Sequence, residues 1–200
     1  MTEPNEYGVA AGYPQPNTRL IEIASHLIPG DALEVGCGNG GDTLWLAQRG
    51  WSVTAADIAA TAVHRLTQLA QETHLEHRIT SLRWDLNQGL PPGDFDLINA
   101  HYLHAGPGLD RPGIFRTAAH ALRPGGHLVV VDHGSIAPWS WDQDPNVGFP
   151  SPREVHTNIE LDPLSSQLVR SDAQQRVASG PDGRIGEVTD HILMIQRTGL

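Results

Sequence analysis

The sequence contains no lysine, so all 13 residues counted as Lys or Arg are arginines. This absence excludes a Walker P-loop, whose lysine contacts phosphate groups, and a pyridoxal phosphate enzyme, which needs a lysine for its Schiff base. It also removes the catalytic lysine of short-chain dehydrogenases. Three common chemistries are therefore excluded before any motif is considered.

Cysteine, basic charge and long apolar runs are also scarce. The single cysteine, Cys37, has no second thiol with which to form an internal disulfide. No apolar run approaches membrane-spanning length, and the first residues, MTEPNEYGVAAGY, lack the basic and apolar regions of a secretory signal. The formal net charge is -10, and no Lys/Arg cluster offers a basic face to nucleic acid. We therefore expect a cytoplasmic protein with neither a membrane nor a nucleic-acid partner.

The composition, 39% hydrophobic and 18% charged over 200 residues, is typical of one globular domain. Short apolar runs alternate with helical patterns, which predicts an α/β fold built from βαβ units with a parallel sheet. The expected strands cover 32–35, 51–56, 78–84, 94–100 and 127–132. The expected helices cover 18–28, 42–49, a segment from 60 onward, 112–123 and a segment that begins after the capping box at 151–154.

The two ends of the chain differ from this alternation. Residues 1–16 are polar and rich in Pro and Gly, so we expect a flexible segment before a single domain over 17–200. Near the other end, β-prone segments 166–179 and 186–197 flank Gly-Pro-Asp-Gly, which predicts an antiparallel hairpin at the sheet edge.

A long segment, residues 134–152, separates the last parallel strand from the helix that starts after it. Such a loop inside a compact domain is usually functional or disordered, and its aromatic residues Trp139, Trp141 and Phe149 argue against disorder. We expect these three residues to form a substrate-binding lid or wall. The alternatives are a flap that closes the core under the hairpin, or half of a dimer contact.

A glycine-rich loop follows the first strand in the stretch LEVGCGNGGDTLWLA, residues 33–47. Gly36, Gly38 and Gly41 fit the G-x-G-x-x-G pattern of dinucleotide enzymes, whereas Gly36, Gly38 and Gly40 fit the G-x-G-x-G loop of S-adenosylmethionine enzymes. Asp57, at the end of the second strand, can accept hydrogen bonds from ribose hydroxyls in either case. The loop alone does not discriminate between the two nucleotides.

Other features favour S-adenosylmethionine. Glu34 lies inside the first strand, where a dinucleotide enzyme normally has an apolar residue, and its carboxylate can accept a bond from the ammonium group of methionine. Asp85 and Leu86 end the third strand, where a carboxylate and an apolar side chain can receive adenine. DFDLI then leads into a polar cluster, and LRPGGHLVVV places a helix, a tight turn and a strand in immediate succession.

The segments LEVGCGNG, VTAADI, RWDLNQ, DFDLINAHYLH and LRPGGHLVVVD occur in the order typical of one family. At these residues the chain resembles the class I S-adenosylmethionine-dependent methyltransferases, most closely the small tellurite-resistance and thiopurine-type branch. The resemblance covers roughly residues 17–197 and includes VGFPSPREV and the final hairpin. It implies a doubly wound, Rossmann-like sheet of seven strands in the order 3-2-1-4-5-7-6, with strand 7 antiparallel.

The resemblance also implies which residues hold the cofactor. The glycines would line the methionine and ribose with Glu34 in support, Asp57 would hold the ribose hydroxyls, and Asp85 would read the adenine edge. The full cofactor set is Glu34, Gly36, Cys37, Gly38, Gly40, Asp57, Ile58, Asp85, Leu86 and Asn99.

Four residues are candidates for work on the acceptor. His101, His104 and His133 follow the fourth and fifth strands and could act as a general base, and Tyr102 could orient the acceptor. The histidine spacing is a weak metal signature, so we expect no metal. Cys37 is read as a small side chain in a crowded turn rather than as a nucleophile.

The expected function is methyl transfer from S-adenosylmethionine, with S-adenosylhomocysteine as product, to a small-molecule acceptor. A flat organic metabolite, a thiol and a metalloid oxyanion all remain open, as do a monomer and a homodimer. The alternatives are a non-catalytic S-adenosylmethionine-binding module and, less favoured, an NAD-dependent oxidoreductase.

Overall fold

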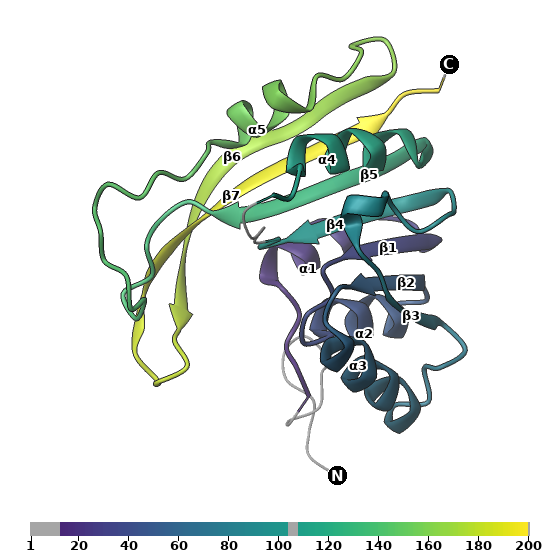
Figure 1. Ribbon diagram of the computed structural model, residues 1–200, viewed down its shortest axis with the longest axis horizontal. Helices are drawn as coiled ribbons and strands as arrows, with labels where there is room; N and C mark the ends of the chain where they lie inside the picture. Colours follow the sequence, from purple (N-terminus) through teal and green to yellow (C-terminus); the bar gives the residue numbers. More distant parts are fainter. Residues whose placement is uncertain (1–12, 104–107, 200) are drawn as a thin grey trace.

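The computed structural model describes residues 13–103 and 108–199, which form one seven-stranded sheet (Figure 1). Its order is β3-β2-β1-β4-β5-β7-β6; β7 runs antiparallel to both of its neighbours, and the remaining pairs are parallel. The strands are β1 (Asp31–Val35), β2 (Ser52–Asp57), β3 (Ile79–Arg83), β4 (Phe95–His101), β5 (Leu122–His133), β6 (Ser166–Ser179) and β7 (Ile185–Arg197). The predicted strand order is confirmed.

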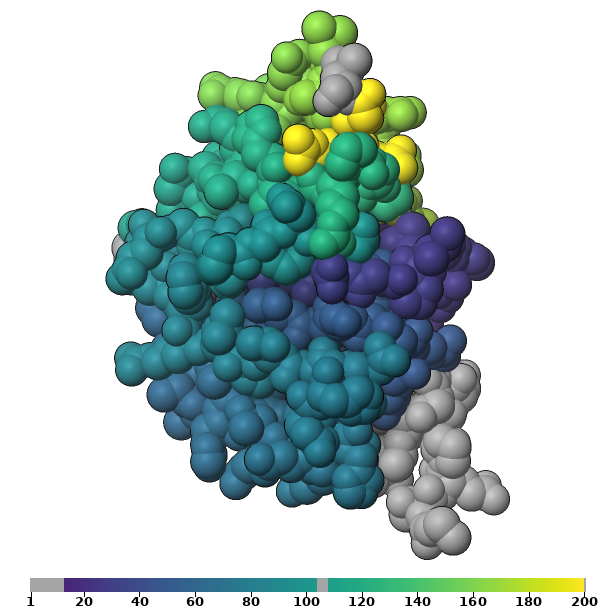
Figure 2. Space-filling view, turned by 90° about the vertical axis from the view of Figure 1, so that its right-hand side faces the viewer, coloured from purple at the N-terminus to yellow at the C-terminus, as the bar shows by residue number. Residues whose placement is uncertain are grey.

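Helices cover both faces of this sheet. They are α1 (Thr18–Ala24), α2 (Gly41–Gln48), α3 (Ala60–Glu72), α4 (Arg111–His120) and α5 (Pro152–Ile159), with a short 3-10 turn, η1, at Leu86–Gln88. In β1, Ala32 faces the core shared with α1, α2 and α3, whereas Leu33 and Val35 face the core shared with α4 and α5. In Figure 2 the bands of colour stack along the sheet, with the blue N-terminal half at one end and the green and yellow C-terminal strands at the other.

The longest helix of the described residues, α3, has 13 residues. Across residues 13–103 and 108–199, therefore, no helix combines the length and the apolar character needed to cross a bilayer.

The capping box predicted at 151–154 is confirmed, but two of the predicted helices, α1 and α4, end earlier than expected. Asn17 caps α1, and Ser151 with Glu154 forms the capping box of α5. However, α1 ends at Ala24 rather than at residue 28, and the side chain of Ile28 is 89% exposed. Helix α4 ends at His120, because the chain enters β5 at Leu122 and pairs there with β4 across a register shift.

The hairpin of β6 and β7 extends past the rest of the sheet. The last pair between β5 and β7 joins His133 to Asp190, whereas β6 and β7 continue to pair from Gln175 with Thr189 as far as Ser179 with Ile185. We call residues 175–189 the hairpin arm; it projects beyond the carboxyl end of β5 (Figure 1). The predicted hairpin at the sheet edge is thus confirmed.

The long segment after β5 runs beside this arm. Arg184 Nη1 donates to the Pro138 carbonyl at 3.0 Å, and the Thr189 amide donates to Ser135 Oγ at 2.8 Å. The ring of Trp139 lies so close to Gly180 that a side chain there would collide with it. Residues 134–139 therefore brace the arm on one side.

Candidate functional site

A cavity of about 310 Å³ opens where β1 and β4 end, which is the edge at which open α/β sheets bind their ligands. Its volume lies at the lower end of the range for small-molecule sites. The described residues that line it are Gln15, Pro16, Asn17, Thr18, Glu34, Gly36, Cys37, Gly38, Asn39, Asp42, His101, Tyr102 and Arg176.

The glycine-rich loop forms one wall of this cavity. Gly36, Gly38 and Gly40 all have positive φ, between 49° and 84°, a region that disfavours other residues. The amides of Gly36 and Cys37 both donate to the carbonyl of Ala56 in β2, at 2.8 and 3.1 Å. The loop is therefore held against the end of the neighbouring strand.

Asp57 fixes the same loop from the end of β2. One carboxylate oxygen accepts from the Gly38 amide and the other from the Ala59 amide, each at 2.9 Å. The side chain is otherwise solvent-accessible, so further lone pairs on its oxygens face outward. Asp57 can thus hold the loop and still accept bonds from a ligand.

The residues predicted to receive adenine lie beside Asp57 but do not line the cavity. Ile58 is 62% exposed on the surface next to it. Asp85 caps η1 by accepting from the Asn87 amide at 3.0 Å, and Leu86 packs partly against the core on the α4 side. Ile58 thus lies on open surface, whereas Leu86 lines a separate cavity of about 250 Å³ between η1 and the start of α4.

Two buried polar residues lie side by side near the site, and of these Glu34 lines the cavity. Glu34 and Asn99 are neighbours in the β1–β4 register and are 4% and 0% exposed. The Thr43 hydroxyl donates to Glu34, and burial, reinforced by the charge of nearby Asp42, raises the pKa of the Glu34 carboxyl well above its usual value. Within the described part of the chain, the Asn99 amide has no hydrogen-bond partner for its nitrogen or its oxygen.

Asp42, in the first turn of α2, is a site residue that the sequence analysis missed. Its Oδ2 lies 2.6 Å from His101 Nδ1, and its Oδ1 accepts from the Asn17 amide at 2.5 Å. The only local signal is an acidic residue in a first helical turn, which ordinarily indicates dipole compensation. Asp42 therefore ties the start of α1 to the end of β4.

Two buried polar atoms near the Asp42–His101 pair lack hydrogen-bond partners among the described residues. His101 Nε2 and Asn17 Nδ2 are both buried and have no partner among the residues that the structure describes. Both residues line the cavity. A buried polar group without a partner costs free energy, so these atoms indicate a place where a ligand supplies the missing bonds.

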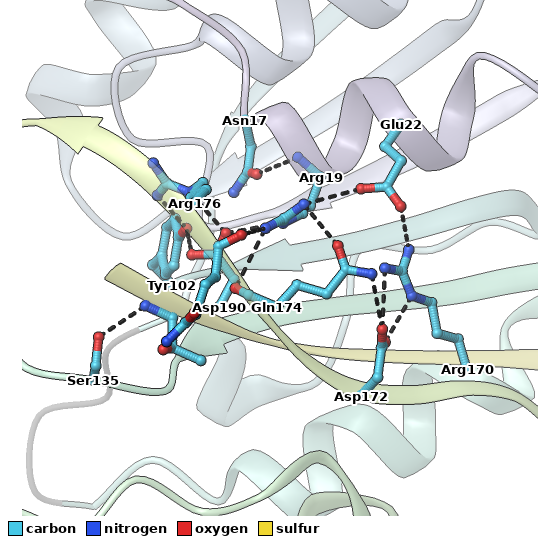
Figure 3. A network of polar contacts seen from close by, with 12 residues as sticks. Asn17, Arg19, Glu22, Tyr102, Ser135, Arg170, Asp172, Gln174, Arg176 and Asp190 are labelled. Carbon is cyan, nitrogen blue, oxygen red and sulfur yellow. Dashed lines mark hydrogen bonds and ion pairs between the residues drawn. The ribbon is translucent and has the colours of Figure 1, made fainter. Parts of the chain in front are cut away.

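A second polar network lies beside the cavity, which its members Tyr102 and Arg176 line (Figure 3). Asp190 in β7 is 1% exposed and accepts from Arg19 Nε at 3.0 Å, Arg176 Nε at 2.7 Å and the Tyr102 hydroxyl at 2.8 Å. Arg176 also donates to the Tyr102 hydroxyl at 3.1 Å. Burial, reinforced by the Asp190 charge, raises the pKa of Tyr102 to about 12, so the phenol stays protonated.

The remaining predicted residues are placed as follows. His133 stacks on the Tyr102 ring with centroids 4.3 Å apart, and His104 lies outside the described residues. Among the described residues that line the cavity, none comes from the segment of Trp139, Trp141 and Phe149. Trp141 is instead 95% exposed, and Trp139 packs on the hairpin arm.

Comparisons of the sequence with known proteins match a methyltransferase family model and proteins named as methyltransferases. A family model described as a methyltransferase domain matches residues 32–126. The chain is 30% identical over 151 residues to 2-heptyl-1-hydroxyquinolin-4(1H)-one methyltransferase of Mycobacteroides abscessus, which covers 72% of this chain and 64% of that protein. It is 33% identical over 122 residues to 27-O-demethylrifamycin SV methyltransferase of Amycolatopsis mediterranei, which covers 58% and 44%. The chain thus spans less than two thirds of the length of these relatives.

Solved structures share the fold at low sequence identity. TehB from Haemophilus influenzae superposes with a TM-score of 0.68 at 16% identity, covering 91% of this chain and 62% of that one. The N-methyltransferase NodS from Bradyrhizobium japonicum gives 0.59 at 21% identity, covering 91% and 94%. The chain thus contains a methyltransferase domain at residues 32–126 and has the fold of the class I S-adenosylmethionine-dependent methyltransferases, a family whose cofactor is S-adenosylmethionine.

Proposed function

We propose that this protein transfers the methyl group of S-adenosylmethionine to a small-molecule acceptor, with a flat organic molecule as the preferred class over a thiol or a metalloid oxyanion. The observation that carries the proposal is the cavity beside the glycine-rich loop, which is lined by residues whose buried polar atoms have no partner among the described residues. Two relatives support the acceptor class, since one is named for a hydroxyquinolinone and the other for a rifamycin.

The lining of the cavity fits the amino-acid end of the cofactor. Glu34 offers a carboxylate to an ammonium group, whereas Arg176 and the side-chain Nδ2 of Asn17 offer donors to a carboxylate. Asn99, buried beside Glu34, lacks both a donor and an acceptor partner among the described residues. A zwitterionic ligand end would complete these groups, and Asp57 would then accept from the ribose hydroxyls.

When bound, S-adenosylmethionine supplies a methyl group on a sulfonium sulfur, so the difficult chemistry belongs to the cofactor. The chain's own residues bind, orient and exclude water. The loop held by Asp57 fixes the position of the ligand on one side. Asp190 fixes two further lining residues, Arg176 and Tyr102, and residues 15–18 also line the cavity.

The test is calorimetry on the purified protein with S-adenosylmethionine, S-adenosylhomocysteine and NAD. We expect micromolar binding of both adenosyl ligands and none of NAD. A charge-assisted hydrogen bond contributes about 1.5–3 kcal/mol, so Asp57→Ala will weaken adenosyl binding about tenfold or more. Absence of adenosyl binding would refute the proposal, and binding without turnover of any acceptor would favour a non-catalytic module.

We also propose that the protein acts in the cytoplasm on small molecules, without nucleic acid, as a monomer or a homodimer. The net charge of -10 supports the exclusion of nucleic acid, since phosphate backbones repel an acidic surface. Sedimentation equilibrium distinguishes monomer from dimer. Retention on immobilised DNA at moderate salt would contradict the exclusion of nucleic acid.

A further inference from the structure

The imidazole of His101 has one ring nitrogen bonded to a carboxylate and the other without a partner among the described residues. Its Nδ1 lies 2.6 Å from the Asp42 carboxylate, and its side chain is only 5% exposed. Its Nε2 is buried, lines the cavity and has no partner among the described residues. A ligand that enters the cavity can supply the partner that this nitrogen lacks.

The carboxylate decides which nitrogen carries the proton. A carboxylate can only accept, so the neutral imidazole carries its hydrogen on Nδ1 and directs the lone pair of Nε2 into the cavity. When Nε2 takes up a proton, the resulting imidazolium is stabilised by the Asp42 charge at 2.6 Å. Asp42 is in turn fixed by the Asn17 amide, so the pair is oriented before any ligand enters.

We propose that His101, oriented by Asp42, is the general base for a hydroxyl acceptor, and that the protein is therefore an O-methyltransferase for phenol-like or enol-like hydroxyl groups. This inference rests on the proposed function, because it assumes that the methyl group is delivered into the same cavity. It narrows the acceptor to a group that must lose a proton. His101 is the catalytic residue, and Asp42 is a positioning residue.

The step balances without any further reagent. The acceptor hydroxyl gives its proton to His101 Nε2 while its oxygen forms the new bond to the methyl carbon. The methyl–sulfur bond breaks, and its electron pair stays on sulfur, which becomes a neutral thioether. The positive charge of the sulfonium is thereby replaced by the positive charge of the imidazolium, which Asp42 compensates and which then releases its proton to solvent.

Other ionisable groups around the cavity are already engaged. Glu34 accepts from the Thr43 hydroxyl, and Tyr102 donates to Asp190 and accepts from Arg176. The Tyr102 phenol, whose pKa burial raises to about 12, does not compete for a proton at neutral pH. Asp42 is occupied by His101 and Asn17. Of the described side chains that line the cavity, His101 is therefore the one suited to take a proton from a hydroxyl acceptor.

The first measurement is of the histidine itself. Nitrogen-detected NMR of the whole protein reports the tautomer of each imidazole, with His101 assigned by its loss in His101→Gln. We expect the Nδ1–H tautomer in the wild type and a mixture of tautomers in Asp42→Asn. A wild-type His101 in the Nε2–H tautomer would overturn the proposal, because Nε2 would then have no lone pair to accept a proton.

The second measurement compares two acceptors with the complete enzyme and isotopically labelled cofactor. Para-methoxyphenol must lose a proton to react, whereas thiophenol ionises unaided near neutral pH. General-base catalysis contributes about 100-fold or more, so His101→Gln will lower kcat for the phenol about 100-fold and leave thiophenol nearly unchanged. Asp42→Asn will lower the phenol rate at least about tenfold, without a matching rise in KM.

Controls separate this inference from the proposed function. His64→Gln, on the exposed side of α3, will behave as wild type, and His101→Gln will bind S-adenosylhomocysteine with unchanged affinity. Weakened binding in His101→Gln would make His101 a cofactor ligand, and equal losses for both acceptors would make its role structural. With S-adenosylhomocysteine bound, failure of the wild type to methylate the phenol would overturn only the hydroxyl assignment. Failure to bind S-adenosylhomocysteine would overturn the proposed function.

Discussion

At the scale of single residues, Cys37 shows how position suppresses chemistry. Burial, reinforced by the charges of Glu34 and Asp57, raises the pKa of its thiol to about 12, so the thiolate is scarce at neutral pH. We expect iodoacetamide to leave the folded protein unmodified and to label it once it is unfolded in urea. Cys37→Ser will bind S-adenosylhomocysteine as the wild type does. Rapid labelling of the native protein would contradict this account.

The buried Glu34 carboxyl lowers the free energy of unfolding at pH values at which it is charged. Its folded pKa is raised by burial above the ordinary value of 4.5, so the folded state is favoured while the carboxyl is protonated and loses stability as pH rises from 4.5 through the folded pKa. Glu34→Gln removes this loss. We expect the variant's free energy of unfolding, measured in urea, to rise relative to the wild type between pH 4 and pH 8.

The same substitution tests the role of Glu34 in the site. Without a carboxylate for the ligand's ammonium group, Glu34→Gln will bind S-adenosylhomocysteine about tenfold more weakly. Thr43→Ala is a matched control, because it removes the hydroxyl that donates to Glu34 but keeps the charge. If Glu34→Gln loses stability with rising pH as the wild type does, the pH dependence arises elsewhere.

At the scale of elements, a buried ion pair joins α1 to β7, at the base of the hairpin arm. Arg19 in α1 reaches Asp190 in β7, and both side chains are at least nine-tenths buried. Removing one partner of a buried pair leaves the other charge uncompensated, so Asp190→Asn will lower the free energy of unfolding by about 3 kcal/mol. Glu160→Gln, at the exposed pair with Arg116, will cost less than about 1 kcal/mol. Similar losses in both variants would contradict the burial argument.

The effect of Asp190 has a defined pH dependence. Burial alone would raise its pKa, but the hydrogen bonds from Arg176 and Tyr102 outweigh burial and hold the pKa below the ordinary value of 3.8. A lowered folded pKa gives stability that is present above 3.8 and is lost as pH falls through the folded pKa. The difference between wild type and Asp190→Asn in urea unfolding will therefore narrow on acidification below pH 3.8. A difference that stays constant down to pH 2 would show that the charge of Asp190 is not responsible.

The elements that the sequence predicted are those whose signals are local. Alternating strands and helices, the capping box at Ser151 and the Gly-Pro-Asp-Gly turn each depend on a few adjacent residues, and all three are confirmed. The predicted end of α1 at residue 28 was wrong, because the apolar periodicity continues to Ile28, past the point where the chain leaves the core. The long segment after β5 was expected near the ligand, yet its Trp139 packs on the arm.

The same distinction applies to the site. Glycines, Asp57 and Glu34 lie next to strand ends, so spacing alone indicates that they share one edge of the sheet. Asp42 and His101 are 59 residues apart, and Arg19 and Asp190 are 171 apart. No periodicity or turn signal relates residues at such separations; only the packing of α1 and α2 against the ends of β4 and β7 brings them together.

At the scale of the whole molecule, one cavity is built from four distant parts of the chain. Residues 15–18, the glycine loop with Asp42, the end of β4, and Arg176 of the hairpin arm all line it. Asp42 and Asp190 connect these parts in pairs, since each carboxylate bonds to α1 and to the end of β4. A ligand that fills the cavity therefore restrains parts that belong to both ends of the chain.

Hydrogen exchange measures this coupling directly. We expect S-adenosylhomocysteine, at about 100 times its Kd, to stabilise the folded state by about 2.7 kcal/mol and to slow amide exchange together in residues 15–24, 36–48, 99–103 and 174–179. Asp190→Asn will keep the protection of the glycine loop but weaken that of the arm, because it removes the charge to which Arg19, Arg176 and Tyr102 all donate. Protection confined to residues 36–48 in the wild type would mean that the arm and α1 do not respond to the ligand, and the cavity would then be a local feature of the loop alone.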